Sequence, residues 1–280
     1  MIPILLINLD RNPERLSMMT TQFESLGLKF SKMPAVNGKS FDDAYFNNFA
    51  ENRKNVLSVG RWTKGSMGCL KSHLNAWEVA ANSSSKYTAI FEDDVWIADT
   101  TKDFINTTTW IPADADIIRL ESTASMKCLL SKKKQSVSDH RFLQKLLKNK
   151  SKNAFPLGTG AYIISKEAAK RALNTPQEWQ LFSDRMLFDH TTSQLAKELN
   201  VYQVNPACCV QDKFYHINKN NIVHHSEIEI PNEDNIYTNN SIIKRLLIKI
   251  GKPLGVYYAF QKARLFYFHL SGLKDVPFRK

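Results

Sequence analysis

Three adjacent carboxylates, Glu92, Asp93 and Asp94, follow the apolar run YTAIF, and apolar residues resume directly after them. Charges this close repel one another, and any loss of surrounding water raises the free-energy cost of keeping all three ionised. A bound cation would neutralise them, and hard carboxylate oxygens are the ligands that Mg²⁺ and Mn²⁺ prefer. Proteins commonly hold such ions with one or two carboxylates and a substrate phosphate, so the triplet predicts a metal site for a nucleotide diphosphate. The alternative is an acidic turn on the surface.

Strands and helices alternate along the chain around this triplet. Apolar runs predict buried strands at residues 3–9, 28–36, 87–92, 116–121, 161–165 and 201–205. Capping residues and helical spacing predict helices from Asn12, over 66–82, from Lys166 and near 184–199. This alternation is typical of an α/β sheet with crossover helices, in which ligands bind beyond the carboxyl ends of the strands. The triplet lies at such an end, with Glu92 and Asp94 facing one side and Asp93 the other.

The net charge of +11 is concentrated in two segments of the chain. Residues 127–152 and residues 240–280 each hold nine Lys or Arg against a single acidic residue. The remainder holds 20 basic and 25 acidic residues, so the body of the protein is slightly acidic. A strongly basic protein would suggest a nucleic-acid partner, but this distribution argues against one and assigns the basicity to two attachments.

Both attachments depart from the α/β pattern. Residues 122–156 are rich in Ser and Lys and predict an inserted loop, apart from a short helical patch at 140–149. Residues 231–280 mix aliphatic, aromatic and basic residues and predict a helical extension. That extension either packs on the body or lies on an anionic membrane surface, since interfacial helices have this composition. The catalytic domain would then span residues 1–230.

The cysteines and the apolar segments bear on the cellular compartment. The chain has four cysteines without a CxxC spacing, which predicts neither a zinc site nor a disulfide framework and fits a reducing compartment. The amino end MIPILLINLD lacks the basic start and the cleavage site of a signal peptide and is typical of a buried strand. No apolar run is long enough to span a bilayer. We therefore expect a cytoplasmic protein that is at most peripheral on the inner membrane.

Seven motifs follow one another in order over about 200 residues. They are INLDRNPERL (7–16), PAVNG (34–38), GSMGCLKSH (65–73), IFEDDV (90–95), GTGAYIIS (158–165), FSDRMLFD (182–189) and NPACCVQD (205–212). As a set, these motifs resemble glycosyltransferase family 25, the lipooligosaccharide biosynthesis glycosyltransferases. The family usually has an acidic residue where Ser66 or Met67 stands in this chain, and neither basic segment belongs to its pattern.

The resemblance implies a GT-A type nucleotide-sugar-binding fold with a mostly parallel central sheet. It also implies Mn²⁺ or Mg²⁺, held by Asp94 and Glu92, and a UDP-sugar donor. The implied reaction is inverting transfer of a hexose, most often galactose from UDP-galactose in a β linkage, to a lipid-linked lipooligosaccharide acceptor. Such a reaction needs a base at the acceptor hydroxyl and positive charge at the departing diphosphate.

For the base, the family's aspartate aligns with Asp184, and Asp189 is the fallback. The alternative for Ser183 or Asp184 is a helix-capping role, which Ser and Asp perform well. The expected donor-binding residues are Asn8, Arg11, Arg15, Ser72, His73, Glu92, Asp93, Asp94, Gly158, Thr159, Gly160 and Gln211. Further candidate ligands are Asp212, His224 and His225.

Several of these donor-site residues have structural alternatives. Arg forks onto phosphate oxygens, but Arg11 and Arg15 are spaced to form surface pairs with Glu14 or Glu24. A lone histidine on a helix, such as His73, is often structural. The two glycines at 158 and 160 permit a close approach of backbone N–H groups to a ligand.

Two other function classes are compatible with the residues. One is a metal-dependent phosphohydrolase or nuclease acting on a polyanion, which predicts phosphodiester cleavage with steep salt dependence. The other is a catalytically silent, membrane-associated sugar-nucleotide-binding protein. We expect the glycosyltransferase, because the chain has a single well-placed acidic cluster and because the triplet and Asp184 are intact.

Overall fold

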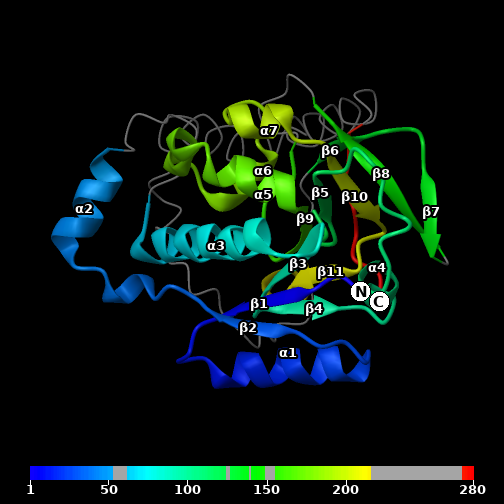
Figure 1. Ribbon diagram of the computed structural model, residues 1–280, viewed down its shortest axis with the longest axis horizontal. Coiled ribbons are helices and arrows are strands. Elements are labelled where there is room, and N and C mark those ends of the chain that lie inside the picture. The colour runs from blue at the N-terminus through cyan, green and yellow to red at the C-terminus, as the bar shows by residue number, and fades with distance from the viewer. Residues whose placement is uncertain (53–61, 124–126, 139, 149–154, 216–272) are drawn as a thin grey trace, which may run out of the picture.

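The computed structural model describes residues 1–52, 62–123, 127–138, 140–148, 155–215 and 273–280. Within them, a large sheet is covered by helices on both faces, which confirms the α/β class (Figure 1). Its ten strands are β1 (Ile4–Asn8), β2 (Ser31–Pro34), β3 (Tyr87–Glu92), β5 (Ile117–Arg119), β6 (Cys128–Leu130), β7 (Gln135–Ser138), β8 (Arg141–Leu147), β9 (Ala161–Ser165), β10 (Val201–Asn205) and β12 (Leu273–Lys274). A second sheet pairs β4 (Val95–Ile97) with β11 (Cys209–Gln211).

The strand order of the large sheet is β12-β6-β8-β10-β5-β9-β3-β1-β2, with β7 paired to β8. The strands β1, β2, β3, β5, β6, β7 and β10 run in one direction, and β8, β9 and β12 run in the other. Most strands are therefore parallel in direction, as expected. The reversed strand β9 lies between β3 and β5, so the sheet is mixed, and its reversal brings the start of β9 to the carboxyl ends of both neighbours.

Side chains alternate between two apolar cores along each strand. Leu5 and Ile7 of β1 face one core, and Ile4 and Leu6 face the other. The first core is covered by α3 (Lys64–Asn82), α5 (Lys166–Leu173) and α6 (Ser183–Phe188), and the second by α1 (Pro13–Ser25) and α4 (Thr101–Ile105) (Figure 1). Strands buried on both faces explain why the sequence shows continuous apolar runs.

Capping residues, proline and glycine set the ends of the helices that position the site. Pro13 opens α1 at a position where the missing N–H has no helical partner, and Gly27 follows its end at a φ of +67°. Thr63 and Ser66 form a reciprocal capping box at the start of α3, with the Ser66 N–H donating to Thr63 Oγ1 at 3.0 Å. Ser66, one of the two positions where the resemblance leads us to expect an acidic residue, therefore belongs to the cap of α3.

The expected loop at 122–156 is largely wrong. The segment contributes β6, β7 and β8, and the patch at 140–149, expected to be helical, contains β8, which pairs with β10 in the middle of that half of the sheet. Arg141 and Leu143 are buried while Phe142 between them is partly exposed, a strand alternation that the basic residues obscured. The described part of this insertion thus completes the sheet.

The expected helix near 184–199 is two short helices, α6 and α7 (Gln194–Glu198). Between them Asp189 accepts hydrogen bonds from Thr191 and Thr192, and this turn interrupts the helical pattern. The sequence also did not predict α2 (Asp43–Glu51), α8 (Asp212–Tyr215) or β4.

The carboxyl-terminal extension is described only over residues 273–280. This end is extended rather than helical, because β12 pairs with β6 and Val276 is buried against the body. The predicted domain boundary at 230, the rest of the predicted helical extension, and His224 and His225 lie outside the described residues.

Candidate active site

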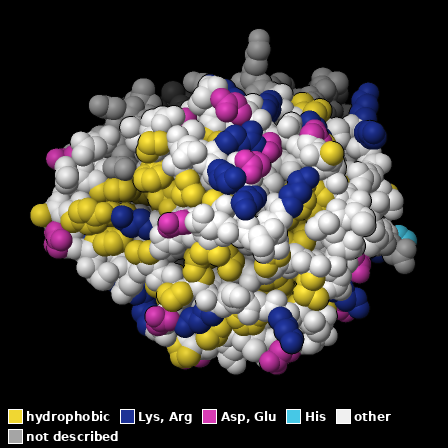
Figure 2. All heavy atoms as spheres, viewed as in Figure 1, with side chains coloured by type: hydrophobic (Ala, Val, Ile, Leu, Met, Phe, Trp, Pro, Cys, Tyr) yellow, Lys and Arg dark blue, Asp and Glu magenta, His cyan; other side chains and the backbone are white. Residues whose placement is uncertain are grey.

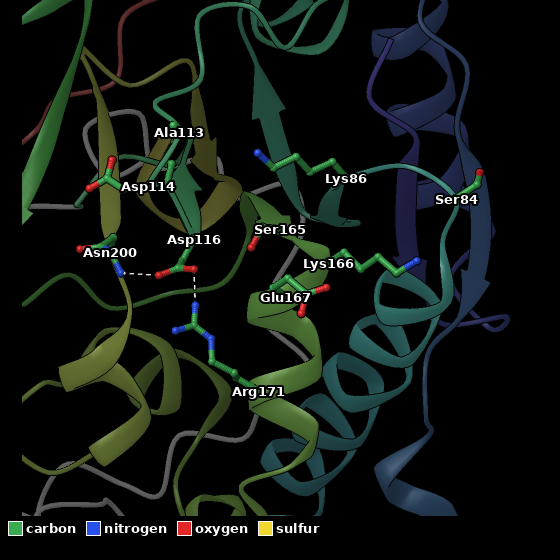
Figure 3. A pocket seen from close by; sticks show the side chains of 11 residues that line it. Ser84, Lys86, Ala113, Asp114, Asp116, Ser165, Lys166, Glu167, Arg171 and Asn200 are labelled. Carbon is green, nitrogen blue, oxygen red and sulfur yellow. Dashed lines mark hydrogen bonds and ion pairs between the residues drawn. The ribbon is translucent and has the colours of Figure 1, made fainter.

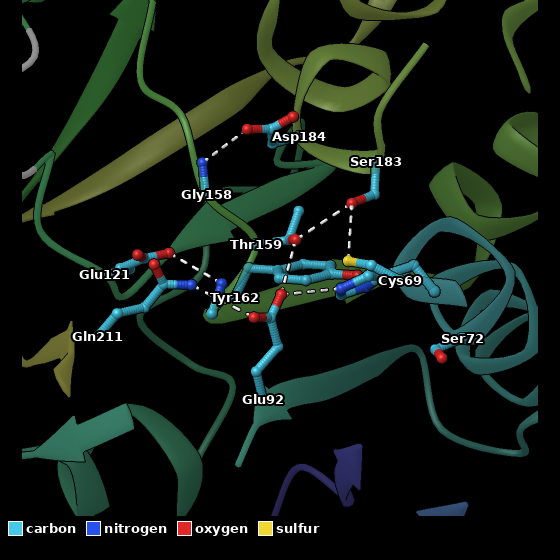
Figure 4. Close-up of polar contacts among 12 residues, drawn as sticks. Cys69, Ser72, Glu92, Glu121, Gly158, Thr159, Tyr162, Ser183, Asp184 and Gln211 are labelled. Atoms are coloured by element: carbon cyan, nitrogen blue, oxygen red, sulfur yellow. Dashed lines mark hydrogen bonds and ion pairs between the residues drawn. The ribbon is translucent and has the colours of Figure 1, made fainter. Parts of the chain in front are cut away.

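The chemistry-bearing residues converge where the carboxyl ends of β3 and β5 meet the start of β9 (Figure 4). Glu92 is the last residue of β3, and its backbone N–H donates to the Gly160 carbonyl at 2.8 Å. Glu121 follows β5 by two residues, and Asp184 lies in the first turn of α6. This is the edge at which ligands bind in open α/β sheets.

Glu92 is held by three side chains. Its Oε1 accepts hydrogen bonds from His73 Nε2 at 3.0 Å and from Thr159 Oγ1 at 2.8 Å, and its Oε2 accepts one from Gln211 Nε2 at 3.3 Å. Burial opposes ionisation, but the hydrogen bonds from His73 and Thr159 hold the pKa of Glu92 below its usual value. The structure thus commits both Glu92 oxygens to protein donors.

His73 extends this contact into the core. Trp77 Nε1 donates to the Tyr162 hydroxyl at 2.7 Å, and that hydroxyl lies 2.9 Å from His73 Nδ1. Because Tyr162 accepts from Trp77, its own proton is available to Nδ1, and the proton on Nε2 then goes to Glu92. His73 is 1% exposed, so it orients Glu92 from behind and does not face the ligand side.

Asp93 faces the opposite side of the sheet from Glu92. Its Oδ2 accepts a hydrogen bond from Asn8 Nδ2 at 2.7 Å, and its Oδ1 forms an ion pair with Arg15 Nη1 at 3.0 Å. The sequence predicted a positive partner for the triplet, and for Asp93 that partner is Arg15 of α1. Asn8 and Arg15 therefore lie at the site and both contact Asp93, and Asn8 Nδ2 also donates to the Asn12 carbonyl at 3.2 Å.

Asp94 lacks such partners among the described residues. Its side chain is buried, with 8% of the residue exposed, and no hydrogen-bond donor of the described residues reaches Oδ1. Burial and the neighbouring Glu92 carboxylate raise the pKa of Asp94 to about 7. A buried carboxylate oxygen without a donor is suited to a hard divalent cation, so Asp94 fits the metal that the sequence predicts. Glu92 fits it less well, because its oxygens have other partners.

A softer set of ligand atoms lies nearby. Among the described residues, the ligand atoms of Cys69, His73 and Glu92 all fall within 4.8 Å of one another. His73 is already bonded to Glu92 there, and burial together with the Glu92 charge raises the pKa of the Cys69 thiol well above its usual value. A protonated thiol is a poor ligand. This set does not suit the expected Mg²⁺ or Mn²⁺.

Asp184 faces the same edge from the helical side. Its Oδ2 accepts the Gly158 N–H at 3.0 Å and its Oδ1 accepts the Arg185 N–H at 2.8 Å, while the side chain stays partly exposed. The N-cap of α6 is Phe182, so neither Ser183 nor Asp184 caps the helix. The fallback base Asp189 is fully buried and bonded to Arg185, Thr191 and Thr192.

The glycines of the 158–160 segment serve protein contacts. The Gly158 N–H goes to Asp184 and the Gly160 N–H goes to Glu121 Oε2 at 2.9 Å. Gly158 has a φ of +92°, and a Cβ there would lie 2.8 Å from Glu121 Oε1. Glycine is therefore needed at 158 because the Glu121 carboxylate lies close to its backbone, whereas we expected from the sequence that a ligand would lie there.

Two expected donor-site residues have structural contacts elsewhere. Ser72 Oγ accepts the Val36 N–H at 2.8 Å and donates to the Gly68 carbonyl at 2.8 Å, which ties α3 to the segment after β2. Its side chain points away from the carboxylates (Figure 4). Arg11 is exposed and bonded through Nη1 to Asn37 Oδ1.

Sequence reasoning missed Arg119, Glu121 and Lys213. Glu121 is 1% exposed, and burial raises its pKa to about 7 although Arg119 opposes this. It carries the signal that identified Glu92, an acidic residue at the end of an apolar strand. Lys213 follows Asp212 in α8, and the Asp212 N–H donates to the Asp94 carbonyl at 2.7 Å. Burial and other groups affect the pKa of Glu92, Asp94 and Glu121 more strongly, and the Lys213 ammonium lowers the pKa of all three.

A pocket of about 510 Å³ lies at the opposite edge of the sheet, before the start of β3, β5 and β10 (Figure 3). Arg171 pairs there with Asp116, which also accepts the Asn200 N–H at 2.8 Å. Lys and Arg side chains lie beside Asp and Glu side chains on the face shown in Figure 2. Because the pocket lies at the amino ends of the parallel strands, it is separate from the carboxylates at their carboxyl ends.

Comparisons with known proteins agree with the motifs. The sequence profile of glycosyltransferase family 25 (LPS biosynthesis protein) matches residues 1–189. Lipooligosaccharide biosynthesis protein lex-1 of Haemophilus influenzae is 28% identical over 243 residues, which cover 74% of this chain and 76% of the relative. Lacto-N-neotetraose biosynthesis glycosyltransferase LgtE of Neisseria meningitidis serogroup B is 31% identical over 206 residues, covering 66% and 68%.

Among solved structures, the chain matches a glycosyltransferase involved in the glycosylation of the major capsid of PBCV-1. It has 11% sequence identity and a TM-score of 0.39, and the match covers 75% of this chain and 91% of that one. None of the described helices is both long and apolar enough to cross a membrane. The family profile spans more than half of the chain, including the acidic triplet and Asp184, and the chain therefore belongs to glycosyltransferase family 25.

Proposed function

We propose that this chain is an inverting, metal-dependent hexosyltransferase of GT-A type that uses a UDP-sugar, with UDP-galactose as the preferred donor and a β-linked product. The observation that carries the proposal is the Asp94 carboxylate, which is buried at the carboxyl edge of the sheet and whose Oδ1 has no hydrogen-bond donor within the described part of the chain. A carboxylate in that state is stabilised by a cation shared with a diphosphate. Family membership supports glycosyl transfer as the reaction.

The end of the site that binds the sugar nucleotide, the donor end, would be organised around Asp94. Asp94 would hold Mn²⁺ or Mg²⁺, which supplies Lewis-acid stabilisation of the departing diphosphate when bound. Lys213 adds a positive charge on the same side, since it acts on three carboxyls of the site. Asn8 and Arg15 fix Asp93, and His73, Thr159 and Gln211 fix Glu92, so the two carboxylates that precede Asp94 anchor the chain that leads to it.

The acceptor end would be organised around Asp184. Each of its oxygens accepts one backbone N–H, and a carboxylate oxygen has a second lone pair that can accept another proton donor. The partly exposed carboxylate can thus accept the proton of an acceptor hydroxyl as that hydroxyl attacks the anomeric carbon. The bond to UDP breaks on the opposite face, which inverts the configuration.

For the acceptor, the names of the relatives favour a lipid-linked saccharide of lipooligosaccharide. A membrane-bound acceptor also gives the basic residues 240–280 a role as a peripheral attachment to the anionic inner face of the cytoplasmic membrane. Replacing the Lys and Arg residues between positions 244 and 264 with Gln leaves the packed end at 273–280 in place and should then reduce co-sedimentation with vesicles that contain anionic lipid. Unchanged sedimentation would refute the attachment.

A donor screen tests the function. The protein is incubated with Mn²⁺ and each common UDP-sugar, and UDP release is measured with and without lactose-like or heptose-like acceptors. We expect acceptor-dependent release with one UDP-hexose and a product of inverted configuration by NMR. Degradation of DNA or RNA without any turnover of a nucleotide sugar would instead favour the phosphohydrolase alternative.

A further inference from the structure

Two charged residues at the end of β5 hold the segment that joins the basic insertion to β9. Arg119 ends β5, and Glu121 follows it by two residues, so both side chains project to the same side of the extended chain. Arg119 Nη1 donates to the Gly158 carbonyl at 2.5 Å and Nη2 donates to the Leu157 carbonyl at 3.1 Å. Glu121 Oε2 accepts the Gly160 N–H at 2.9 Å. The pair therefore binds residues 157–160 at both carbonyl and amide groups.

The segment held in this way contacts three acidic side chains in succession. The Gly158 N–H donates to Asp184, the Thr159 hydroxyl donates to Glu92, and the Gly160 N–H donates to Glu121 (Figure 4). Glu92 lies at the donor end of the proposed site and Asp184 at the acceptor end. Residues 158–160 thus bridge the two ends through hydrogen bonds from adjacent residues of one short segment.

The geometry leaves little freedom in this link. Arg119 and Glu121 are each 1% exposed, and Arg119 Nη2 lies 3.8 Å from Glu121 Oε2. The Arg119 guanidinium also stacks 4.5 Å from the centre of the Phe188 ring in α6, the helix that carries Asp184. At Gly158 the Glu121 carboxylate fills the space that a side chain would occupy. Buried charged groups with several partners fix a local conformation strongly.

We infer that Arg119 and Glu121 are positioning residues that set the location of Asp184 relative to the donor site by holding the 157–160 segment. The inference rests on the proposed function, in which Asp184 is the base. Neither residue needs to touch the substrates, and their burial is consistent with that. Their effect should fall on the transfer step, because a displacement of about 1 Å at a reacting group can lower a rate about 100-fold.

Steady-state kinetics of Glu121→Ala test the inference, with the donor and acceptor that the wild type uses. We expect kcat to fall about 10-fold to 100-fold while UDP affinity, measured by calorimetry, stays within about twofold. Glu121→Gln retains an oxygen that can accept the Gly160 N–H, so it should recover most of kcat. A drop in UDP affinity equal to the drop in kcat, or a Glu121→Gln variant as slow as Glu121→Ala, would overturn the inference.

A second measurement separates positioning from an independent catalytic role. In an Asp184→Asn background the base is absent, so adding Glu121→Ala should lower kcat no further. If the double variant instead loses kcat by the product of the two separate effects, the inference is wrong. If Glu121→Ala does not fold, Arg119→Lys keeps the charge but loses the forked contact and should show the same loss of kcat with intact UDP binding.

A matched control is Glu167→Gln, which changes an exposed glutamate at the opposite edge of the sheet and should leave kcat unchanged. An inactive wild type in the donor screen would refute the proposed function itself. An active wild type with an unimpaired Glu121→Ala variant would refute the positioning role alone.

Discussion

Replacing Asp94 with Asn should stabilise the metal-free protein while removing its activity. Asp94 is buried beside Glu92, and no donor among the described residues reaches its Oδ1. Burial and the Glu92 charge raise its pKa from 3.8 to about 7. The folded protein therefore binds more protons than the unfolded chain between about pH 4 and pH 7, and Asp94 lowers the stability as the pH rises through that range. Asn carries no charge and removes this cost.

The size of the effect follows from the pKa. One pKa unit corresponds to about 1.4 kcal/mol, so a charged Asp94 costs the folded state at most about 4 kcal/mol at pH 8 and about 2 kcal/mol at pH 5. Relaxation around the charge reduces both values, and we expect Asp94→Asn to raise the free energy of unfolding by about 1–3 kcal/mol at pH 8. The gain should shrink as the pH falls.

Urea unfolding in EDTA, followed by tryptophan fluorescence at pH 8 and pH 5, measures the effect. The neighbouring Asp93→Asn is the matched control, because Asp93 is paired with Arg15 and its loss leaves a buried charge. That control should destabilise the protein by about 3 kcal/mol. Mn²⁺ should stabilise the wild type and not Asp94→Asn. If Asp94→Asn destabilises the protein as Asp93→Asn does, the Asp94 charge is already satisfied and the reasoning is refuted.

Three further variants test other parts of the site. Lys213→Ala should weaken UDP binding about tenfold, measured by calorimetry, because it removes a positive charge beside the carboxylates; unchanged affinity would place Lys213 away from the diphosphate. Ser72→Ala should cost about 1 kcal/mol in urea unfolding, since it leaves the partly buried Val36 N–H without its acceptor, and kcat should be unaffected. Asp189→Asn should lower the melting temperature with little change in UDP affinity, because Asp189 holds the turn after α6; a selective loss of kcat with an unchanged melting temperature would make Asp189 the base instead.

The sequence predicted the parts of the fold in which local pattern and tertiary role agree. Strands buried on both faces give continuous apolar runs, so β3, β9 and β10 match the predicted ranges 87–92, 161–165 and 201–205. The first helix was predicted from Pro13 and Gly27, which act through backbone geometry alone. These signals do not depend on distant partners.

The elements that failed depend on partners far along the chain. Residues 141–147 include two polar side chains that are buried, Arg141 and Gln144, so their local pattern is weak, and pairing with β10 decides their conformation. Asp189 ends α6 through hydrogen bonds to Thr191 and Thr192, which compete with continuation of the helix. Neither effect is visible in the helical periodicity.

For the site, the sequence predicted which carboxylates lie near one another but not which side chains they contact. The triplet was predicted from residue type and position and Asp184 from the family resemblance, and Glu92 and Asp184 both contact the 158–160 segment at one edge of the sheet (Figure 4). Their partners could not be predicted, because His73, Arg15 and Gly158 are 19 to 78 residues distant from the carboxylates that they contact. Glu121 was overlooked because a single acidic residue after a strand is common on protein surfaces.

The central claim is that Asp94 binds a divalent cation together with the diphosphate of a sugar nucleotide. Calorimetric titration of UDP into the wild type and into Asp94→Asn, each in Mn²⁺ and in EDTA, tests it most directly. The account predicts that Mn²⁺ tightens UDP binding to the wild type at least about tenfold and has no effect on Asp94→Asn. Equal UDP affinity of the wild type in Mn²⁺ and in EDTA would contradict it.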